Sequence, residues 1–117
     1  MPKHLSVNQA KLLNQHRYIL KKLASVDVKT RQQILKNAPA DLFKTLNLIF
    51  KMISSGQLQL TKKQEDKIKR HKGLIRRSSE LKSTAIKRKL QNQRGGFLPA
   101  ILSAALPIIG SIIKSVL

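Results

Sequence analysis

Cysteine is absent from this chain of 117 residues, and aromatic and acidic residues are scarce. Without cysteine there is no disulfide framework, no thiolate metal site and no cysteine nucleophile. The aromatic residues are Tyr18, Phe43, Phe50 and Phe97, too few for an aromatic platform that stacks single-stranded bases. Five acidic residues face 24 lysines and arginines, so the formal net charge is +19. Such a charge favours polyanionic partners, either nucleic acid or an anionic membrane surface.

The chain also lacks a recognisable catalytic or metal-binding constellation. Its histidines, His4, His16 and His71, are far apart in sequence, and the adjacent Glu65 and Asp66 face different sides of a helix. No nucleophile occupies a recognisable elbow, and no loop resembles a phosphate-cradling motif. His16 falls on an apolar stripe, which predicts a histidine packed at the edge of a core. We therefore expect no enzymatic activity, no catalytic residues, no cofactor and no metal site.

The first half of the chain predicts an all-α fold that begins with a small bundle of three helices over residues 1–56. Apolar residues recur there at helical spacing, and about a dozen large ones are available for a core. The predicted helices are residues 6–24 with a Ser6–Gln9 capping box, 27–37 with Asp27 as N-cap, and 39–56 with Pro39 in the first turn and Gly56 as a left-handed C-terminal residue.

Residues 57–94 form a basic segment with two further predicted helices. Thr61 caps the first, with Gln64 as its capping-box partner; Ser78 and Ser79 end it, and residues 80–93 form the second. From position 61 to 94, 13 lysines and arginines oppose three acidic residues, a net charge of +10. A few excess lysines would fit an ordinary solvated surface, but this density does not.

The basic segment predicts binding of double-stranded DNA without sequence preference. Lysine and arginine displace condensed counterions from phosphates, whereas reading a sequence needs side chains held against base edges, and no such set stands out. A helix-turn-helix over residues 27–56 is a less favoured alternative, because the connection at 37–39 has no glycine. The expected DNA-binding residues are Lys62, Lys63, Lys67, Lys69, Arg70, Lys72, Arg76, Arg77, Lys82, Lys87, Arg88, Lys89 and Arg94.

Two adjacent glycines, residues 95–96, separate the basic segment from an apolar tail over residues 97–117. The tail has a single charge, Lys114, and is long enough to cross a bilayer, which takes about 20 helical residues. Pro107 would kink it, which favours a helix that lies in a membrane interface or acts as a tether. The expected membrane residues are Phe97, Leu98, Ile101, Leu102, Leu106, Ile109, Ile112 and Ile113.

Two other destinations for the tail stay open. It could pack into the protein's own bundle, although a core of some 50 residues looks too small to cover it. It could also dock into a groove of a capsid or another partner protein.

The run Arg94-Gly95-Gly96-Phe97-Leu98-Pro99, followed by alanine, isoleucine and leucine with Pro107 and Gly110, resembles a known viral family. It is similar to the C-terminal part of the adenovirus core protein X (mu) precursors, and to small basic proteins of adintoviruses and Polintons. The resemblance covers about residues 87–117. Members of that family condense DNA and are cut by a viral cysteine protease after an Arg-Gly-Gly element.

The resemblance implies a virion core protein that acts in the virion and the host nucleus. It places a cut between Gly96 and Phe97, with Gln93, Arg94, Gly95 and Gly96 as recognition residues. The adenovirus protein is rich in arginine and has no folded body, so the helices predicted over residues 6–56 are a departure from the family.

Our leading hypothesis is therefore a DNA-condensing virion core protein whose tail meets membrane or capsid until proteolysis releases it. The main alternative is a membrane-active protein, lytic or anchoring, whose basic body only attracts anionic lipid. A bacteriocin with a double-glycine leader and a sequence-specific regulator are further alternatives.

Overall fold

The computed structural model describes residues 6–58, 60–92 and 97–117, and the all-α fold is confirmed. Within these ranges the chain forms helices and no strand. The helices are α1 Val7–Gln15, α2 Arg17–Ser25, α3 Val28–Asn37, α4 Ala40–Ser54, α5 Lys62–Ile68, the 3₁₀ turn η1 Lys69–His71, α6 Lys72–Ser79, α7 Ser83–Asn92 and α8 Phe97–Val116.

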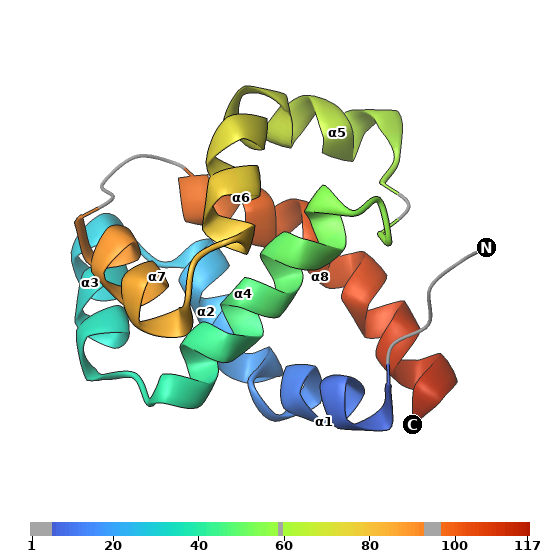
Figure 1. Ribbon diagram of the computed structural model, residues 1–117, viewed down its shortest axis with the longest axis horizontal. Helices are drawn as coiled ribbons and strands as arrows, with labels where there is room; N and C mark the ends of the chain where they lie inside the picture. The colour runs from blue at the N-terminus through green and yellow to red at the C-terminus, as the bar shows by residue number, and fades with distance from the viewer. Residues whose placement is uncertain (1–5, 59, 93–96) are drawn as a thin grey trace.

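Two long helices, α4 and α8, form the centre of the molecule (Figure 1). The helices α6 and α7 pack against α4, whereas α2 and α5 pack against α8; α1 contacts both. The buried side chains of all these elements join in one hydrophobic core. The rest of the chain is therefore organised around one helix from its first half and the C-terminal helix.

The predicted helix starts are confirmed by their hydrogen bonds. Ser6 with Gln9 and Thr61 with Gln64 form reciprocal capping boxes, and the Asp27 carboxylate accepts from the backbone N–H of Thr30. Each cap satisfies N–H groups that the first turn leaves unpaired. The residue after the C-cap of α4, Gly56, has a φ of 76°, a backbone conformation that glycine adopts without strain.

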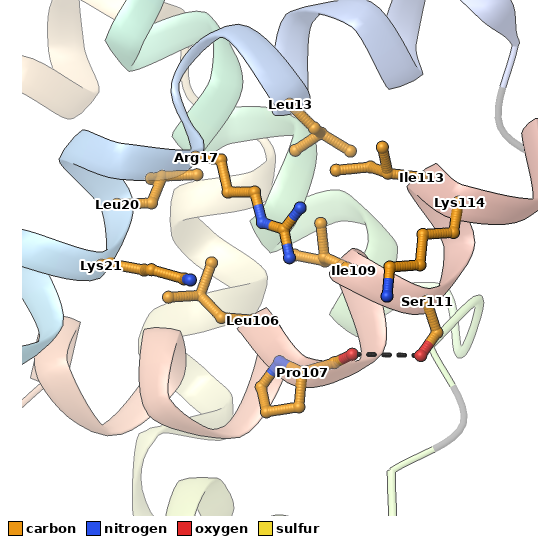
Figure 2. A pocket seen from close by; sticks show the side chains of 11 residues that line it. Leu13, Arg17, Leu20, Lys21, Leu106, Pro107, Ile109, Ser111, Ile113 and Lys114 are labelled. Atoms are coloured by element: carbon orange, nitrogen blue, oxygen red, sulfur yellow. Dashed lines mark hydrogen bonds between the residues drawn. The ribbon is translucent and has the colours of Figure 1, made fainter. Parts of the chain in front are cut away.

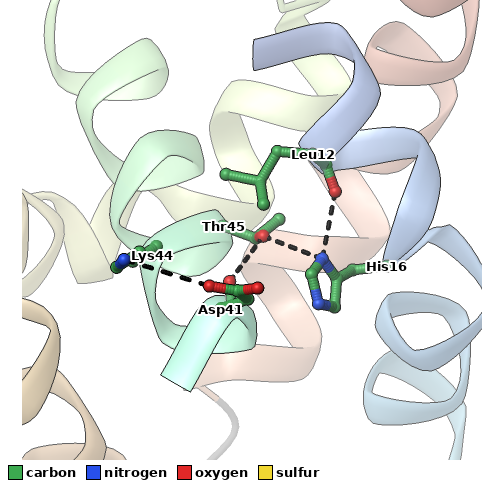
Figure 3. Close-up of polar contacts among 5 residues, drawn as sticks. All are labelled: Leu12, His16, Asp41, Lys44 and Thr45. Carbon is green, nitrogen blue, oxygen red and sulfur yellow. Dashed lines mark hydrogen bonds and ion pairs between the residues drawn. The ribbon is translucent and has the colours of Figure 1, made fainter. Parts of the chain in front are cut away.

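The single helix predicted over residues 6–24 is wrong, because the chain breaks at His16 into α1 and α2. The His16 side chain is buried, and its Nδ1 lies 3.0 Å from the Leu12 carbonyl oxygen and 3.1 Å from the Thr45 hydroxyl (Figure 3). Thr45 itself donates to the Asp41 carbonyl at 2.8 Å. Since a carbonyl can only accept, the proton is on Nδ1. The contact with Thr45 therefore holds the break between α1 and α2 against α4.

The fourth predicted helix also differs, because η1 divides it into α5 and α6. The break comes where Ile68 is buried and the chain must turn from packing on α8 to packing on α4. The predicted end at Ser78 and Ser79 is confirmed: these buried residues close the last turn of α6, and the chain turns at 80–82. Pro39 is the N-cap of α4 and not part of its first turn.

The expected division at residue 56 is not seen in the packing. Residues 7–54 form four helices instead of three, and their buried faces are covered by elements from the rest of the chain. The tail is α8, and it packs on α1, α2 and α5 as part of the core. The physical reason is that α5, α6 and α7 add buried apolar residues to the body, so it covers more apolar surface than residues 1–56 alone.

Candidate nucleic-acid interface

The described DNA-binding residues that the sequence predicts lie on α5, η1, α6 and α7 and in the turn before α7. Ten of them are exposed, Lys87 and Lys89 are half-buried, and Arg94 lies outside the described residues. We call the exposed ten the basic surface. They are Lys62, Lys63, Lys67, Lys69, Arg70, Lys72, Arg76, Arg77, Lys82 and Arg88.

Isolated apolar residues fix the orientation of these helices. Ile68 and Ile75 are each 1% exposed and anchor α5 and α6, and Ile86 and Leu90 do the same for α7. Because an α-helix repeats every 3.6 residues, burying so few positions turns the neighbouring lysines and arginines outward. The basic surface thus follows from the placement of a few apolar side chains among many charges.

The turn between α6 and α7 is held to α4 by Asn47. Its side-chain amide donates to the carbonyls of Leu81 at 3.0 Å, Ser79 at 3.3 Å and Ser78 at 3.5 Å. The far end of α7 is held by the Gln32 amide, which donates to the Gln91 carbonyl at 3.4 Å. These long-range bonds satisfy carbonyls at helix ends and position the two basic helices.

The cations of the basic surface make no ion pair within the described part of the chain. The single ion pair found there joins Lys44 Nζ and Asp41 Oδ1 at 3.9 Å, on an exposed turn of α4. The carboxylates that share the basic segment, Glu65, Asp66 and Glu80, are exposed and unpaired in the same ranges. The positive charge is therefore free to act on a polyanion.

On one face of α6, two residues of the basic surface line a groove. A groove of about 190 Å³ lies between the end of α4 and α6, lined by Lys72 and Arg76 together with Ile53, Ser54 and Ile75. Lys72 and Arg76 are four residues apart on α6, so they project from the same side, and Lys69 precedes them in η1. This row is the best-defined part of the basic surface.

Two of the predicted DNA-binding residues, Lys87 and Lys89, are less exposed than the ten residues of the basic surface. Lys87 Nζ lies 5.6 Å from the centroid of the Phe43 ring, an arrangement in which the ring attracts the ammonium. Lys89 is half-buried on the same helix. Both therefore have less freedom than the exposed ten to reach a phosphate.

The helix-turn-helix alternative does not fit the packing. Its second helix would be α4, which buries Leu42, Phe43, Leu46, Ile49 and Phe50 and is covered by α1, α6 and α7. A helix enclosed in this way cannot enter a DNA groove.

The predicted membrane residues lie on α8 and face the protein interior. Phe97, Leu98, Ile101, Leu102, Ile109 and Ile113 are buried, and Leu106 and Ile112 are half-buried. Among the described residues, α8 is the one helix long and apolar enough to cross a membrane, by length and composition only, and half of that stretch is buried inside the protein.

Most of the predicted protease site lies outside the described residues, which exclude Gln93, Arg94, Gly95 and Gly96. Phe97, on the far side of the expected cut, is the first residue of α8 and is 1% exposed. Its ring centroid lies 5.8 Å from that of Phe50 and 5.6 Å from that of His71. In this fold the residue that follows the expected cut is a core residue.

The cations of the first half of the chain are not among the predicted DNA-binding residues. Ten lysines and arginines there oppose two aspartates over residues 1–56, a net charge of +8. Most of the described ones are exposed, and Arg17, Lys21 and the tail residue Lys114 line a common groove. The charge sum was readable from the sequence, whereas the meeting of α2 with α8 was not.

The described residues contain no group of three or more histidine, cysteine, aspartate and glutamate side chains placed to hold a metal ion. Comparisons with family models, curated proteins and solved structures return no match to this chain.

Proposed function

We propose that the protein binds double-stranded DNA through the basic surface, without sequence preference. The observation that supports this most is that ten lysines and arginines on α5, η1, α6 and the region of α7 are exposed and make no ion pair within the described ranges. Their helices are anchored by buried residues, so the charges stand on a folded support. These cations would displace the counterions that are condensed on the DNA phosphates.

We further propose that this binding serves DNA condensation in a virion core, within the virion and the host nucleus. The support is the resemblance at residues 94–99 together with the net charge of +19. A viral cysteine protease that cuts after Gly96, and a capsid protein or membrane that meets the tail, belong to the same proposal. Because α8 packs in the core, we expect a cut there to leave residues 97–117 bound to the body.

The test measures affinity for several unrelated duplexes of equal length across a salt series, by fluorescence anisotropy with the full chain. The variant Lys69→Gln, Lys72→Gln, Arg76→Gln removes one row of cations. Its matched control, Lys11→Gln, Lys29→Gln, Lys36→Gln, removes the same charge from exposed positions on α1 and α3. The slope of log affinity against log salt changes by about 0.9 for each phosphate that the protein neutralises, so removing the row should make the slope shallower by about 2.7.

Similar tight binding of all the duplexes, with a smaller salt slope only in the Lys69, Lys72 and Arg76 variant, would support the proposal. Equal effects in both triple variants would show a diffuse charge effect and no basic surface. A preference for one duplex that survives raised salt would favour a sequence-specific regulator.

A membrane-active protein is the second candidate, favoured by the length and apolar composition of α8. It requires α8 to leave the core, since six of its eight expected membrane residues are buried. The test is leakage of anionic vesicles with the full chain and with a peptide of residues 97–117. Leakage of anionic vesicles by the full chain would favour this candidate, because it would show that α8 can leave the core and enter the membrane.

A further inference from the structure

A groove between α2 and α8 brings three cations together above an apolar floor (Figure 2). Its volume is about 290 Å³. Arg17 and Lys21 come from α2 and Lys114 from the last turn of α8; Leu13, Leu106 and Ile109 supply apolar surface. None of these three cations belongs to the basic surface. The ends of their side chains point toward the middle of the groove.

Gly110 explains how closely Arg17 approaches α8. A Cβ atom at position 110 would lie 3.3 Å from Arg17 Nη2, a distance tighter than an ordinary contact. The guanidinium therefore lies close over the backbone of α8, and a side chain at position 110 would require it to shift by a few tenths of an ångström. Gly110 is buried, while its neighbours Pro107 and Ser111 are exposed. At Gly110 the helix therefore presents only backbone atoms to the Arg17 guanidinium.

The charge of the groove is uncompensated by its own residues. Its lining includes no carboxylate, and within the described ranges Arg17, Lys21 and Lys114 form no ion pair. Like charges held near apolar surface repel more strongly than in bulk water, because the local dielectric is lower. An anion placed among them would relieve that repulsion, and a guanidinium offers two parallel donors to a phosphate or carboxylate.

We propose that this groove binds an anionic amphiphile with a single alkyl chain. The phosphate or carboxylate head contacts Arg17, Lys21 and Lys114, and the first methylenes of the chain pack on Leu13, Leu106 and Ile109. A nucleic-acid backbone would contact the cations but would leave the apolar floor of the groove without a partner. The volume is close to the lower end of ligand pockets, about 300–1,000 Å³, which suits a head group and a short stretch of chain.

The probe is decyl phosphate below its micelle concentration, with the full chain, followed by calorimetry and by amide chemical shifts in NMR. We expect Arg17→Gln to weaken binding about tenfold, because it removes a charge-assisted bidentate contact. Gly110→Ala keeps the charge and favours the helix, and it shifts the guanidinium only slightly, so we expect binding to weaken by less than in Arg17→Gln. Lys36→Gln, an equal charge change on an exposed face of α3, is the matched control and should leave binding within about twofold.

Three further probes separate the sources of the anion. Inorganic phosphate alone and decanol alone should each bind far more weakly than decyl phosphate, because each supplies half of the contact. Phosphatidylglycerol vesicles compared with phosphatidylcholine vesicles test an anionic membrane surface as the source. Arg17-dependent binding of dissolved decyl phosphate supports the proposal, and Arg17-dependent binding of the anionic vesicles without binding of decyl phosphate would overturn it.

Equal weakening in Arg17→Gln and Lys36→Gln would overturn the proposal. So would a drop in duplex affinity in Arg17→Gln with unchanged binding of decyl phosphate, since the cluster would then belong to a nucleic-acid surface. The Lys69, Lys72 and Arg76 variant should bind decyl phosphate normally, so failure of this inference and failure of the proposed DNA binding can be told apart.

Discussion

The basic segment and α8 are opposite in composition, yet they lie against each other. Residues 61–94 have a net charge of +10, whereas residues 97–117 have one charge. In the fold α5 packs directly on α8, with Ile68 buried at this end of the basic segment. The sequence boundary at residues 95–96 is thus a boundary of composition and not of packing.

The comparison teaches how few apolar residues a charged helix needs to act as a cover. Ile68, Ile75, Ile86 and Leu90 are the buried large apolar residues of α5, α6 and α7, and most lysines and arginines of these helices are exposed. In return α8 supplies nine buried positions to the core. The charged helices provide a soluble exterior, and the apolar helix provides the interior that holds them in place.

The first way to break this arrangement is to remove α8 from the chain. Six large side chains of α8 are buried, and at about 1.5–3 kcal/mol each their removal costs more than about 9 kcal/mol, comparable to the whole stability of a typical domain, about 5–15 kcal/mol. We expect residues 1–96 alone to lack cooperative thermal unfolding by circular dichroism, and a separate peptide of residues 97–117 to restore it. A cooperative melt of 1–96 without the peptide would show that the tail is dispensable. A peptide with Ile101→Asp and Ile109→Asp is the matched control.

A single core substitution sharpens the same comparison. Ile101 is 0% exposed, so Ile101→Ala should lower the free energy of unfolding by about 2–5 kcal/mol in urea titrations. Ile112→Ala, at a half-buried position of the same helix, is the control and should cost clearly less. Equal effects at the two positions would mean that α8 is not packed in the register described.

The local features of the fold were readable from the sequence, and the long-range ones were not. Ser6–Gln9, Thr61–Gln64, Asp27 and Gly56 mark helix ends because each acts on the backbone within a few residues. The break at His16 was missed because it depends on Thr45 of another helix. A stripe of apolar residues continuous through position 16 masks such a break.

The destination of α8 could not be read from composition. The apolar surface of the tail looked too large for residues 1–56 to cover. Ile68 and Ile75 add buried apolar surface, although they belong to a segment that consists mostly of charged residues. The exposure of most basic side chains follows from residue type, since lysine and arginine are seldom buried without partners. The close approach of Arg17 to Gly110 joins residues 93 positions apart, and no local pattern indicates it.

The link between α4 and the turn that follows α6 offers a prediction of intermediate size. Asn47 donates to three carbonyls, the shortest bond being 3.0 Å to Leu81, so Asn47→Ala leaves part-buried acceptors unpaired and should cost about 1–3 kcal/mol. The exposed Asn37, whose amide bonds the Gln33 carbonyl within α3, is the control, and Asn37→Ala should cost under about 0.5 kcal/mol. Urea unfolding measures both. If Asn47→Ala costs no more than Asn37→Ala, the turn is held by apolar packing alone.

The smallest expected effect is at the N-cap of α3. Hydrogen bonding to the Thr30 side chain, and after it to the Thr30 backbone N–H, lowers the pKa of Asp27 below its ordinary value of 3.8. Because the pKa is depressed in the folded state, the ionised cap stabilises the protein above the unfolded value, and this stabilisation is lost as pH falls through the folded one. Asp27→Ala should therefore lower the melting temperature slightly at neutral pH, and the difference from the parent protein should shrink as the solution is acidified below pH 3.8. Asp27→Asn, which keeps a capping oxygen without the charge, separates hydrogen bonding from ionisation. A melting-temperature difference between Asp27→Ala and the parent that stays constant with pH would show that the carboxylate charge contributes nothing to the cap.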